Sequence, residues 1–204
     1  MSATLIKICG LCDAGAARAA AEAGADLLGF HFCSSARRVA PEEARAMVAA
    51  LDRRPGLVGV FIDQSEAEVE QIADFVGLDW VQLHGSEPPG FRAPLPVVKA
   101  LKVRDGVLPD ADGWPDPILL DSWSPDQRGG TGRAWDWEVA RPLLSARQVI
   151  VAGGLHPGNV GGVVTRFRPH GVDVSSGVES EVRVKEFDRI QAFVQAVREA
   201  DGEG

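Results

Sequence analysis

The chain has 204 residues, of which 45% are hydrophobic and 25% charged, which is ordinary for a globular domain. This length exceeds a minimal domain and falls short of two ordinary ones, so we expect a single domain over residues 1–204. The formal net charge of −8 argues against a nucleic-acid partner, and no apolar run approaches the roughly 20 residues of a membrane span.

Short β-rich runs alternate with amphipathic or alanine-rich segments. The pattern predicts strands over residues 4–9, 26–32, 57–63, 79–84, 96–101, 117–121, 147–152 and 171–175. It predicts helices over residues 13–24, 41–53, 65–76, 136–145, 157–168 and 185–200. The connections after the fourth and fifth strands are short and rich in proline and glycine, so any helix there should be stunted.

Strands that alternate with helices indicate parallel βαβ units of an α/β protein. Eight such strands predict a closed (β/α)8 TIM barrel, with its active site at the carboxyl ends of the strands. A doubly wound open sheet is the structural alternative. No Gly-x-Gly-x-x-Gly motif follows any strand, which weakens a dinucleotide-binding version of that alternative.

The first predicted strand ends in Lys7-Ile8-Cys9-Gly10, which places a cysteine where barrel enzymes hold catalytic groups. A thiolate can act as a base or a nucleophile, but an ordinary thiol has a pKa near ~8.5 and must be activated. Lys7 precedes Cys9 by two residues, so both side chains point to the same face of the strand. Lys7 is therefore a cation that can lower the pKa of Cys9.

Asp121 ends an otherwise apolar strand, where a carboxylate costs free energy unless it is used or paired. Burial would raise its pKa and let it act as a general acid. Alternatively, Asp121 caps a turn or pairs with Arg128 or Arg133. The loop over residues 124–132 has the composition of a mobile lid, which favours the catalytic interpretation.

Other polar residues also lie at strand ends, where a barrel would bring them to one rim: Gln82 and His84 at the end of the fourth strand, and Asp173 in the eighth. Arg37 follows the second strand and could hold a carboxylate in a bidentate fork, although most surface arginines are merely solvated.

Glycines after the seventh and eighth strands indicate a phosphate site. Gly153 and Gly154 follow the seventh strand, and Ser176 and Gly177 follow the eighth. Glycine lets the backbone approach a ligand closely, and barrels often bind phosphate at these two loops. Either pair alone could be an ordinary tight turn, but both together favour phosphate.

Cys9, Cys12, His31 and Cys33 could suggest a zinc or redox module, but their spacing matches no standard zinc site and a second paired knuckle is missing. We therefore expect no metal. Three cysteines fit a reducing cytoplasm better than a disulfide framework, so we expect a cytoplasmic protein.

Motifs along nearly the whole chain resemble those of the phosphoribosylanthranilate isomerase family of tryptophan biosynthesis. The resemblance rests on Lys7-Ile8-Cys9-Gly10-Leu11, Leu28-Gly29-Phe30 with Ser35-Ala36-Arg37, Val58-Gly59-Val60-Phe61, Val81-Gln82-Leu83-His84-Gly85, Leu119-Leu120-Asp121, Gly129-Gly130-Thr131-Gly132 with Asp136-Trp137, Ala152-Gly153-Gly154-Leu155, and residues 172–179. Residues 180–186 depart from the family's usual Ser-Pro-Gly-x-Lys-Asp run.

The resemblance implies a cofactor-free Amadori rearrangement of N-(5′-phosphoribosyl)anthranilate to 1-(2-carboxyphenylamino)-1-deoxyribulose 5-phosphate. It implies that Asp121 is the general acid and Cys9 the general base. It also implies that Arg37 binds the anthranilate carboxylate and that the Gly154 and Ser176-Gly177 loops bind the phosphate. We further expect Lys7, Gln82, His84 and Asp173 to contribute to substrate binding.

In a closed barrel the eighth strand lies beside the first, so we predict an ion pair between Asp173 and Lys7. The runner-up function is a barrel isomerase for another aminated phosphosugar, such as that of histidine synthesis, which would need a second anion cradle near strands three and four. A cysteine-based metal or redox module, or a regulatory barrel without turnover, stays open as a hypothesis of another class. The partner is a small phosphosugar, with no nucleic acid or membrane, and the chain is expected to be a monomer or a homodimer.

Overall fold

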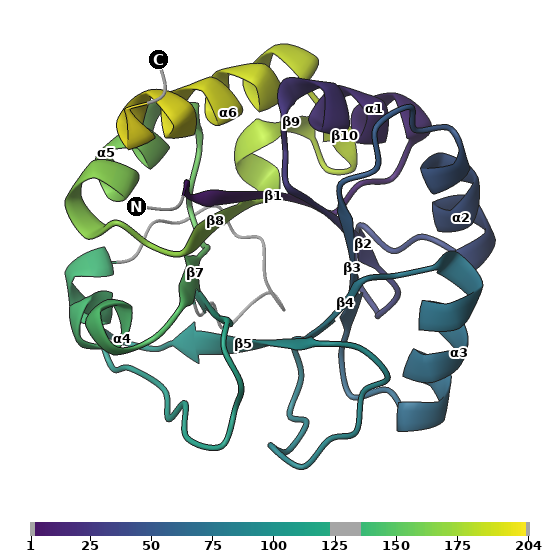
Figure 1. The fold of residues 1–204 in the computed structure, drawn as a ribbon, viewed down its shortest axis with the longest axis horizontal. Helices are drawn as coiled ribbons and strands as arrows, with labels where there is room; N and C mark the ends of the chain where they lie inside the picture. The colour runs from purple at the N-terminus through teal and green to yellow at the C-terminus, as the bar shows by residue number, and fades with distance from the viewer. Residues whose placement is uncertain (1–2, 123–135, 203–204) are drawn as a thin grey trace.

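A computed structural model describes residues 3–122 and 136–202. Eight parallel strands close into a barrel in the order β1 to β8, with β8 beside β1 (Figure 1). The strands are β1 (Leu5–Cys9), β2 (Leu27–His31), β3 (Gly56–Phe61), β4 (Trp80–Leu83), β5 (Val97–Val103), β6 (Ile118–Ser122), β7 (Val149–Val151) and β8 (Gly171–Val174). The predicted barrel is confirmed, and the open sheet is wrong.

Helices surround most of the barrel, as Figure 1 shows. They are α1 (Ala14–Ala23), α2 (Pro41–Ala49), α3 (Glu66–Val76), α4 (Arg141–Ala146), α5 (Pro157–Phe167) and α6 (Phe187–Asp201), with a 3-10 turn η1 (Trp137–Ala140) before α4. No helix among the described residues is long and apolar enough to cross a membrane.

Local sequence signals explain where these helices begin and end. The Asp13 carboxylate accepts from the backbone N–H of Ala16 at the start of α1, and Ser65 forms a capping box with Glu68 at the start of α3. Helix α2 ends at Ala49, four residues earlier than predicted. Pro55 disfavours helix at Arg54, and the chain must turn into β3 there.

Two segments depart from the regular strand–helix alternation. No helix follows β4 or β5 among the described residues, as predicted from the composition of those connections. After β8 the chain forms a short 3-10 turn η2 (Ser176–Val178) and a small hairpin of β9 (Glu179–Glu181) and β10 (Val184–Lys185). The hairpin occupies the place where the last predicted helix was expected to begin.

Strand register decides which side chains meet inside the barrel, because successive residues point to opposite faces. Lys7 lies in register with Asp173 of β8, and Cys9 with Gly29 of β2. One apolar cluster contains Leu119 of β6 and residues of β5 and β7, packed with Trp80 of β4. Residues 82 and 121 lie two positions further along those same faces, so polar side chains replace apolar ones toward the carboxyl ends.

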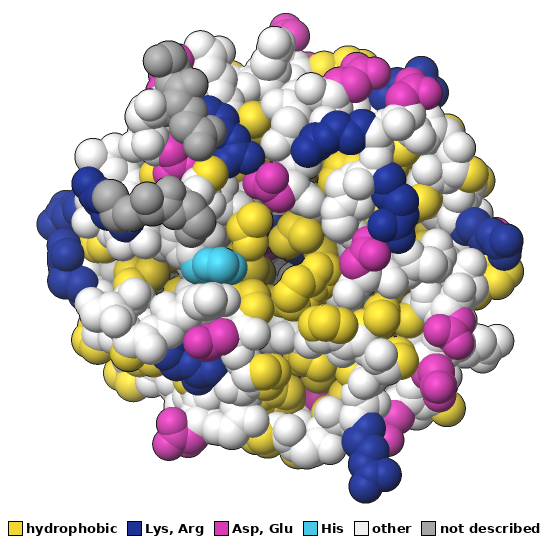
Figure 2. Space-filling model, in the orientation of Figure 1, with side chains coloured by type: hydrophobic (Ala, Val, Ile, Leu, Met, Phe, Trp, Pro, Cys, Tyr) yellow, Lys and Arg dark blue, Asp and Glu magenta, His cyan; other side chains and the backbone are white. Residues whose placement is uncertain are grey.

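The surface shows no single dominant charge patch on the face seen in Figure 2. Apolar side chains gather at the centre of that face, and charged side chains of both signs surround them.

Candidate active site

A pocket opens at the carboxyl ends of the strands and brings the predicted site residues together. It is lined by Cys9, His31, Cys33, Ser35, Arg37, Val60, Ile62, Gln82, His84, Asp121, Ala152, Gly153, Gly154, Leu155, Asp173, Val174, Ser175 and Ser176. Of the predicted site residues, only Lys7 and Gly177 do not line it. Residues far apart in sequence therefore converge on one hollow, as barrel topology requires.

Lys7 is buried beside Cys9. Its ammonium lies 2.9 Å from the Asp173 carboxylate, which confirms the predicted ion pair. Burial alone would lower the pKa of Lys7, but Asp173 and Cys9 outweigh it and raise the pKa above its ordinary value. Lys7 is therefore a fixed positive charge.

Gly29 of β2 provides the space in which Lys7 and Cys9 lie side by side. A Cβ at this position would lie 2.8 Å from Cys9 Sγ and 3.2 Å from Lys7 Nζ. Even a methyl group would therefore push against the thiol. Gly29 was recognised only as part of a motif, because its importance depends on the contact across two strands.

The Cys9 thiol has a raised pKa. Its burial penalises the thiolate, the positive charge of Lys7 opposes this effect, and the negative charge of Asp173 adds to it. Burial is the largest of these causes. Cys9 Sγ lies 3.3 Å from His31 Nε2, a contact that was not predicted.

Asp121 is the penultimate residue of β6 and is buried, with a carboxylate oxygen accepting from the N–H of Ser122. Its other oxygen lies 3.5 Å from His84 Nε2, which is long for a hydrogen bond. A Cβ at Gly153 would lie 2.9 Å from the Asp121 carboxylate, so glycine leaves room for it. The alternative partners Arg128 and Arg133 and the expected lid lie outside the described residues.

Gln82 reaches the same side of the pocket from β4. Its side-chain nitrogen lies 3.4 Å from His84 Nδ1. If Gln82 donates this hydrogen bond, the proton of neutral His84 is on Nε2, which faces Asp121. The buried Gln82 Oε1 has no hydrogen-bond partner among the described residues and is thus free to bind a donor from a ligand.

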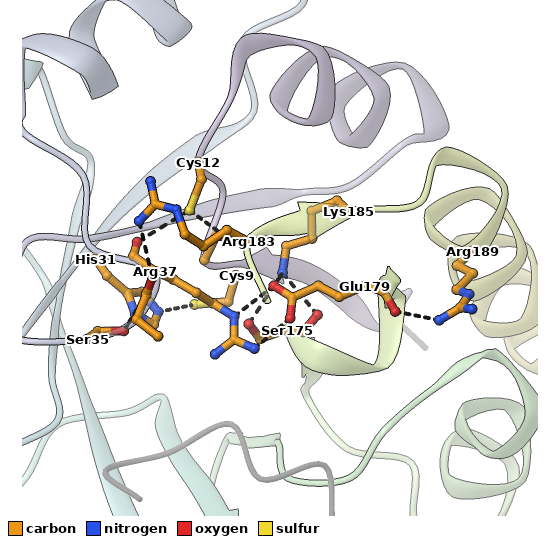
Figure 3. Close-up of polar contacts among 12 residues, drawn as sticks. Cys9, Cys12, His31, Ser35, Arg37, Ser175, Glu179, Arg183, Lys185 and Arg189 are labelled. Carbon is orange, nitrogen blue, oxygen red and sulfur yellow. Dashed lines mark hydrogen bonds and ion pairs between the residues drawn. The ribbon is translucent and has the colours of Figure 1, made fainter. Parts of the chain in front are cut away.

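Arg37 is not a free surface arginine. Its Nε and Nη2 donate to the two carboxylate oxygens of Glu179, at 2.7 and 2.5 Å (Figure 3). Lys185 of β10 donates to the same carboxylate at 2.9 Å and to the carbonyl of Ser175. The bidentate fork expected of Arg37 is thus made with a carboxylate of the chain itself, while Arg37 also lines the pocket.

Glu179 and Lys185 are site residues that were missed from the sequence. Glu179 was part of a recognised motif but was given no role. Burial would raise the pKa of Glu179, but Arg37 and Lys185 together lower it, so the carboxylate stays ionised. The hairpin β9–β10 thereby fixes the position of Arg37.

The loops after β7 and β8 meet closely at the pocket. Gly153 and Gly154 have φ values of +83° and +74°, which favour glycine. A Cβ on Gly177 would overlap the carbonyl oxygen of Leu155, so only glycine lets the two loops pack this closely. This arrangement exposes Gly154 and Ser176 to the pocket while Gly177 lies behind them.

The other two cysteines have no evident part in this chemistry. All three are free thiols. Cys12 Sγ donates weakly to the carbonyls of Gly10 and Arg37, and burial raises the pKa of Cys33 to about 11. Among the described residues, no three His, Cys, Asp or Glu side chains lie close enough to hold a metal ion.

These features define a class: a (β/α)8-barrel enzyme with ionisable side chains gathered at the carboxyl ends of its strands. A family model described as N-(5'phosphoribosyl)anthranilate (PRA) isomerase matches residues 6–196. The chain therefore belongs to the N-(5'-phosphoribosyl)anthranilate isomerase family.

Individual relatives agree with this assignment. The chain is 44% identical to the N-(5'-phosphoribosyl)anthranilate isomerase of Desulforudis audaxviator, over 97% of this chain and 99% of the relative. The structure of the Thermus thermophilus phosphoribosyl anthranilate isomerase matches with a TM-score of 0.87 and 37% identity, over 96% of this chain and 99% of that chain. A structure of the isomerase in complex with reduced 1-(o-carboxyphenylamino)-1-deoxyribulose 5-phosphate matches with a TM-score of 0.81 and 31% identity, over 96% of this chain and 99% of that chain.

Proposed function

We propose that this chain converts N-(5′-phosphoribosyl)anthranilate to 1-(2-carboxyphenylamino)-1-deoxyribulose 5-phosphate in tryptophan biosynthesis, without a cofactor. Family membership supports the substrate. The observation that carries the mechanism is that Cys9 on β1 and Asp121 on β6 line one pocket. A thiol and a carboxyl group on different strands can act on different atoms of one bound sugar.

Asp121 is the general acid in this proposal. It protonates the ring oxygen of the ribose, so that the furanose opens to a protonated Schiff base between C1′ and the anthranilate nitrogen. The position of Asp121 supports this role, because it lines the pocket 3.5 Å from His84 and a carboxyl group there can give a proton to a bound sugar.

Cys9 is the general base. Its thiolate removes the C2′ proton, the C2′–H electrons form the C1′–C2′ double bond, and the iminium nitrogen becomes neutral. The resulting enolamine gains a proton at C1′ and loses the proton of its C2′ hydroxyl to give the ketone. The positive charge of Lys7 supports this role because it opposes the cost of burying the thiolate.

The two ends of the substrate require separate anion sites. We propose that Arg37 binds the anthranilate carboxylate through Nη1, since Nε and Nη2 hold Glu179. The phosphate is proposed to lie on backbone N–H groups of the Gly153-Gly154 and Ser176-Gly177 loops. Gln82, His84 and Asp173, which line the same pocket, are proposed to contact the sugar.

The runner-up substrate, an aminated phosphosugar with phosphates at both ends, would need a second anion cradle. A second hollow does lie beside the ends of β3, β4 and β5, and its lining includes Asp63, Lys99, Lys102 and Arg104. Asp63 brings a negative charge, and Lys99 is already paired with Glu87. Assays with both substrates decide whether this hollow broadens the range.

Replacement of either proton-transfer group tests the proposal. We expect Cys9→Ala and Asp121→Asn each to reduce kcat by roughly 100-fold or more, because each removes a proton-transfer step. Turnover of purified protein is measured by the loss of anthranilate-type fluorescence, and circular dichroism checks folding. Rescue of a tryptophan auxotroph that lacks the isomerase provides the cellular readout.

Cys12→Ser is the matched control, because it replaces a thiol that does not line the pocket. We expect it to rescue growth as the wild type does. Near-normal turnover in folded Cys9→Ala or Asp121→Asn would show that the role of that residue is wrong. Failure of the wild-type chain to rescue growth and to turn over the substrate would overturn the function itself.

A further inference from the structure

An imidazole connects the proposed base to the rim of the barrel. His31 Nε2 lies 3.3 Å from Cys9 Sγ, and His31 Nδ1 lies 2.9 Å from Ser35 Oγ (Figure 3). His31 ends β2, and Ser35 is a partly exposed residue in the following loop. Cys9, His31 and Ser35 all line the pocket.

The hydrogen bonds around Ser35 leave its hydroxyl proton free to move. The backbone N–H of Arg37 can only donate, and it donates to Ser35 Oγ at 3.1 Å. A hydroxyl oxygen has two lone pairs, so Ser35 can also accept from His31 Nδ1–H. Alternatively, it can turn its own proton toward His31 Nδ1. Both tautomers of neutral His31 are therefore compatible with its two neighbours.

The surroundings of His31 disfavour the imidazolium form. The charged and titratable groups around the Cys9–His31 pair are Lys7, Arg37, His84, Asp173, Lys185 and Cys33. Burial lowers the pKa of His31 well below 6.5, and Lys7, His84, Arg37 and Lys185 lower it further. A stable thiolate–imidazolium pair is therefore disfavoured, and the imidazole is neutral near pH 7.

We propose that His31 is a proton relay between the Cys9 thiol and the hydroxyl of Ser35, a partly exposed residue of the pocket. The Cys9 Sγ–H bond breaks and its proton joins His31 Nε2, while the proton on His31 Nδ1 passes to Ser35 Oγ. Ser35 releases one of its two protons to water. The products are a Cys9 thiolate, the other neutral tautomer of His31, an intact Ser35 hydroxyl and a hydronium ion.

The same groups then stabilise the active form of the base. In the new tautomer His31 Nε2 carries a proton and donates to the thiolate, and hydrogen bonding to the charged form favours that form. This inference rests on the proposed function, since a relay matters for turnover only if Cys9 is the base. His31 acts through Cys9 and is therefore a positioning residue.

The first test measures thiolate formation in the absence of substrate. Cys9 and Cys12 lie between Lys7 and Arg18 on one tryptic peptide, so the experiment uses a Cys12→Ser background. The rate of Cys9 alkylation by iodoacetamide is followed from pH 6 to 10 by mass spectrometry. We expect His31→Ala to shift the profile upward by about one pH unit, because it loses the hydrogen bond to the thiolate.

The second test separates a relay from a simple hydrogen bond. His31→Gln keeps an N–H group that can donate to the thiolate, but an amide cannot exchange tautomers as imidazole does. We expect His31→Gln to shift the alkylation profile less than His31→Ala. Both variants should lose roughly 100-fold in kcat, which is the lower end of the range for proton transfer.

Added imidazole provides a rescue that a structural role would not give. We expect imidazole at about 50–100 mM to raise the kcat of His31→Ala at least tenfold, because it can act as a diffusible base. His170→Ala, which removes a histidine outside the pocket, is the control and should not respond.

Wild-type turnover in His31→Ala, or no response of the folded variant to imidazole in either assay, would overturn the relay. The alkylation assay stays decisive if the chain does not turn over the substrate, because imidazole should also bring the His31→Ala alkylation profile back toward that of the wild type. Suppose that Cys9→Ala stays active while His31→Ala shows the expected upward shift of its alkylation profile. This result would reject Cys9 as the base and leave the relay intact. If His31→Ala does not fold, His31→Gln carries the same comparison.

Discussion

Lys7 and Lys99 are buried on two different strands of the barrel, and comparing their positions shows when a buried ion pair indicates a functional site. The side chains of Lys7 and Lys99 are 2% and 5% exposed, and each lies within 2.9 Å of a carboxylate. Lys7 on β1 faces the barrel interior beside Cys9. Lys99 on β5 lies between Val98 and Ala100, which belong to the interior cluster, so it points outward.

The outward pair lies where the helical layer is interrupted. Lys99 donates to Glu87 and to the carbonyl of Gly85, and its ammonium lies 5.0 Å from the Trp114 ring centroid. Glu87 accepts from the backbone N–H groups of Asp63 and Gly85. This network joins the loops after β3 and β4 to β5 where no described helix packs. We therefore expect its role to be structural.

Burial and pairing alone therefore do not mark a functional lysine. We expect the face of the strand to decide whether a buried lysine takes part in function, because only the interior face leads to the pocket of Cys9. The following three substitutions, from the largest expected effect to the smallest, test this distinction.

Lys99→Met should chiefly reduce stability. It leaves the Glu87 carboxylate buried without its cation, which typically costs about 3–5 kcal/mol, or a factor of at least 100 in the folding equilibrium. We expect kcat of the folded protein to stay within about twofold of the wild type, because Lys99 does not line the pocket of Cys9. Urea denaturation and steady-state kinetics measure the two effects. A large loss of kcat at unchanged stability would contradict the structural role.

Lys7→Met should reduce activity at neutral pH, and it should also reduce stability because it leaves the Asp173 carboxylate without its cation. Removal of a nearby positive charge raises the pKa of Cys9, so the thiolate population should fall, and we expect kcat of the folded protein to fall by about 10- to 100-fold. Part of this loss should return as the pH rises, because more of the thiol then ionises. The pH profile of kcat measures this recovery, and Lys99→Met is the matched control. A loss of kcat by the same factor at every pH would show that Lys7 does not lower the pKa of the Cys9 thiol.

Glu179→Gln should have the smallest effect on turnover and should act through Arg37. Loss of one charge-assisted pair loosens the guanidinium, so we expect KM to rise by about tenfold with little change in kcat. The Glu179 pKa is lowered in the folded chain, so its ionisation adds stability that is fully present above pH 4.5 and is lost as the pH falls through its lowered pKa. The variant should therefore lose part of the acid dependence of unfolding. An unchanged KM would show that Arg37 does not need Glu179.

Much of the architecture follows from local patterns. Alternating strands and helices, the caps at Asp13 and Ser65, and the Pro- and Gly-rich connections predict the barrel and its helix-free side. Closure of the barrel then predicts the Lys7–Asp173 pair from strand order and side-chain parity alone. These features depend on short-range signals or on strand order, and both can be predicted from the sequence pattern.

Other parts depend on tertiary contacts that local patterns do not encode. The hairpin over residues 179–185 has strands of two or three residues, and its polar contacts join Glu179 to the distant Arg37 and Lys185 to Ser175. The fork of Arg37, expected to hold a ligand, holds Glu179, and the ligand role proposed for Arg37 falls to Nη1. The position of His31 could have predicted its contact with Cys9, because it lies two residues after Gly29, which is in register with Cys9. Its closeness to Cys33 in the sequence suggested metal binding instead.

The pairing of the cations near Cys9 also governs how fast the substrate can arrive. Lys7 is neutralised by Asp173, and Arg37 and Lys185 share Glu179, so these five groups carry one net positive charge. An approaching anion therefore meets mainly the field of a chain with a net charge of −8. Encounter should be slowed at low ionic strength and quickened as salt screens the repulsion over about 10 Å at 0.1 M. If kcat/KM is limited by diffusion, it should rise with added salt. Such a rise would show that the site attracts anions only at short range.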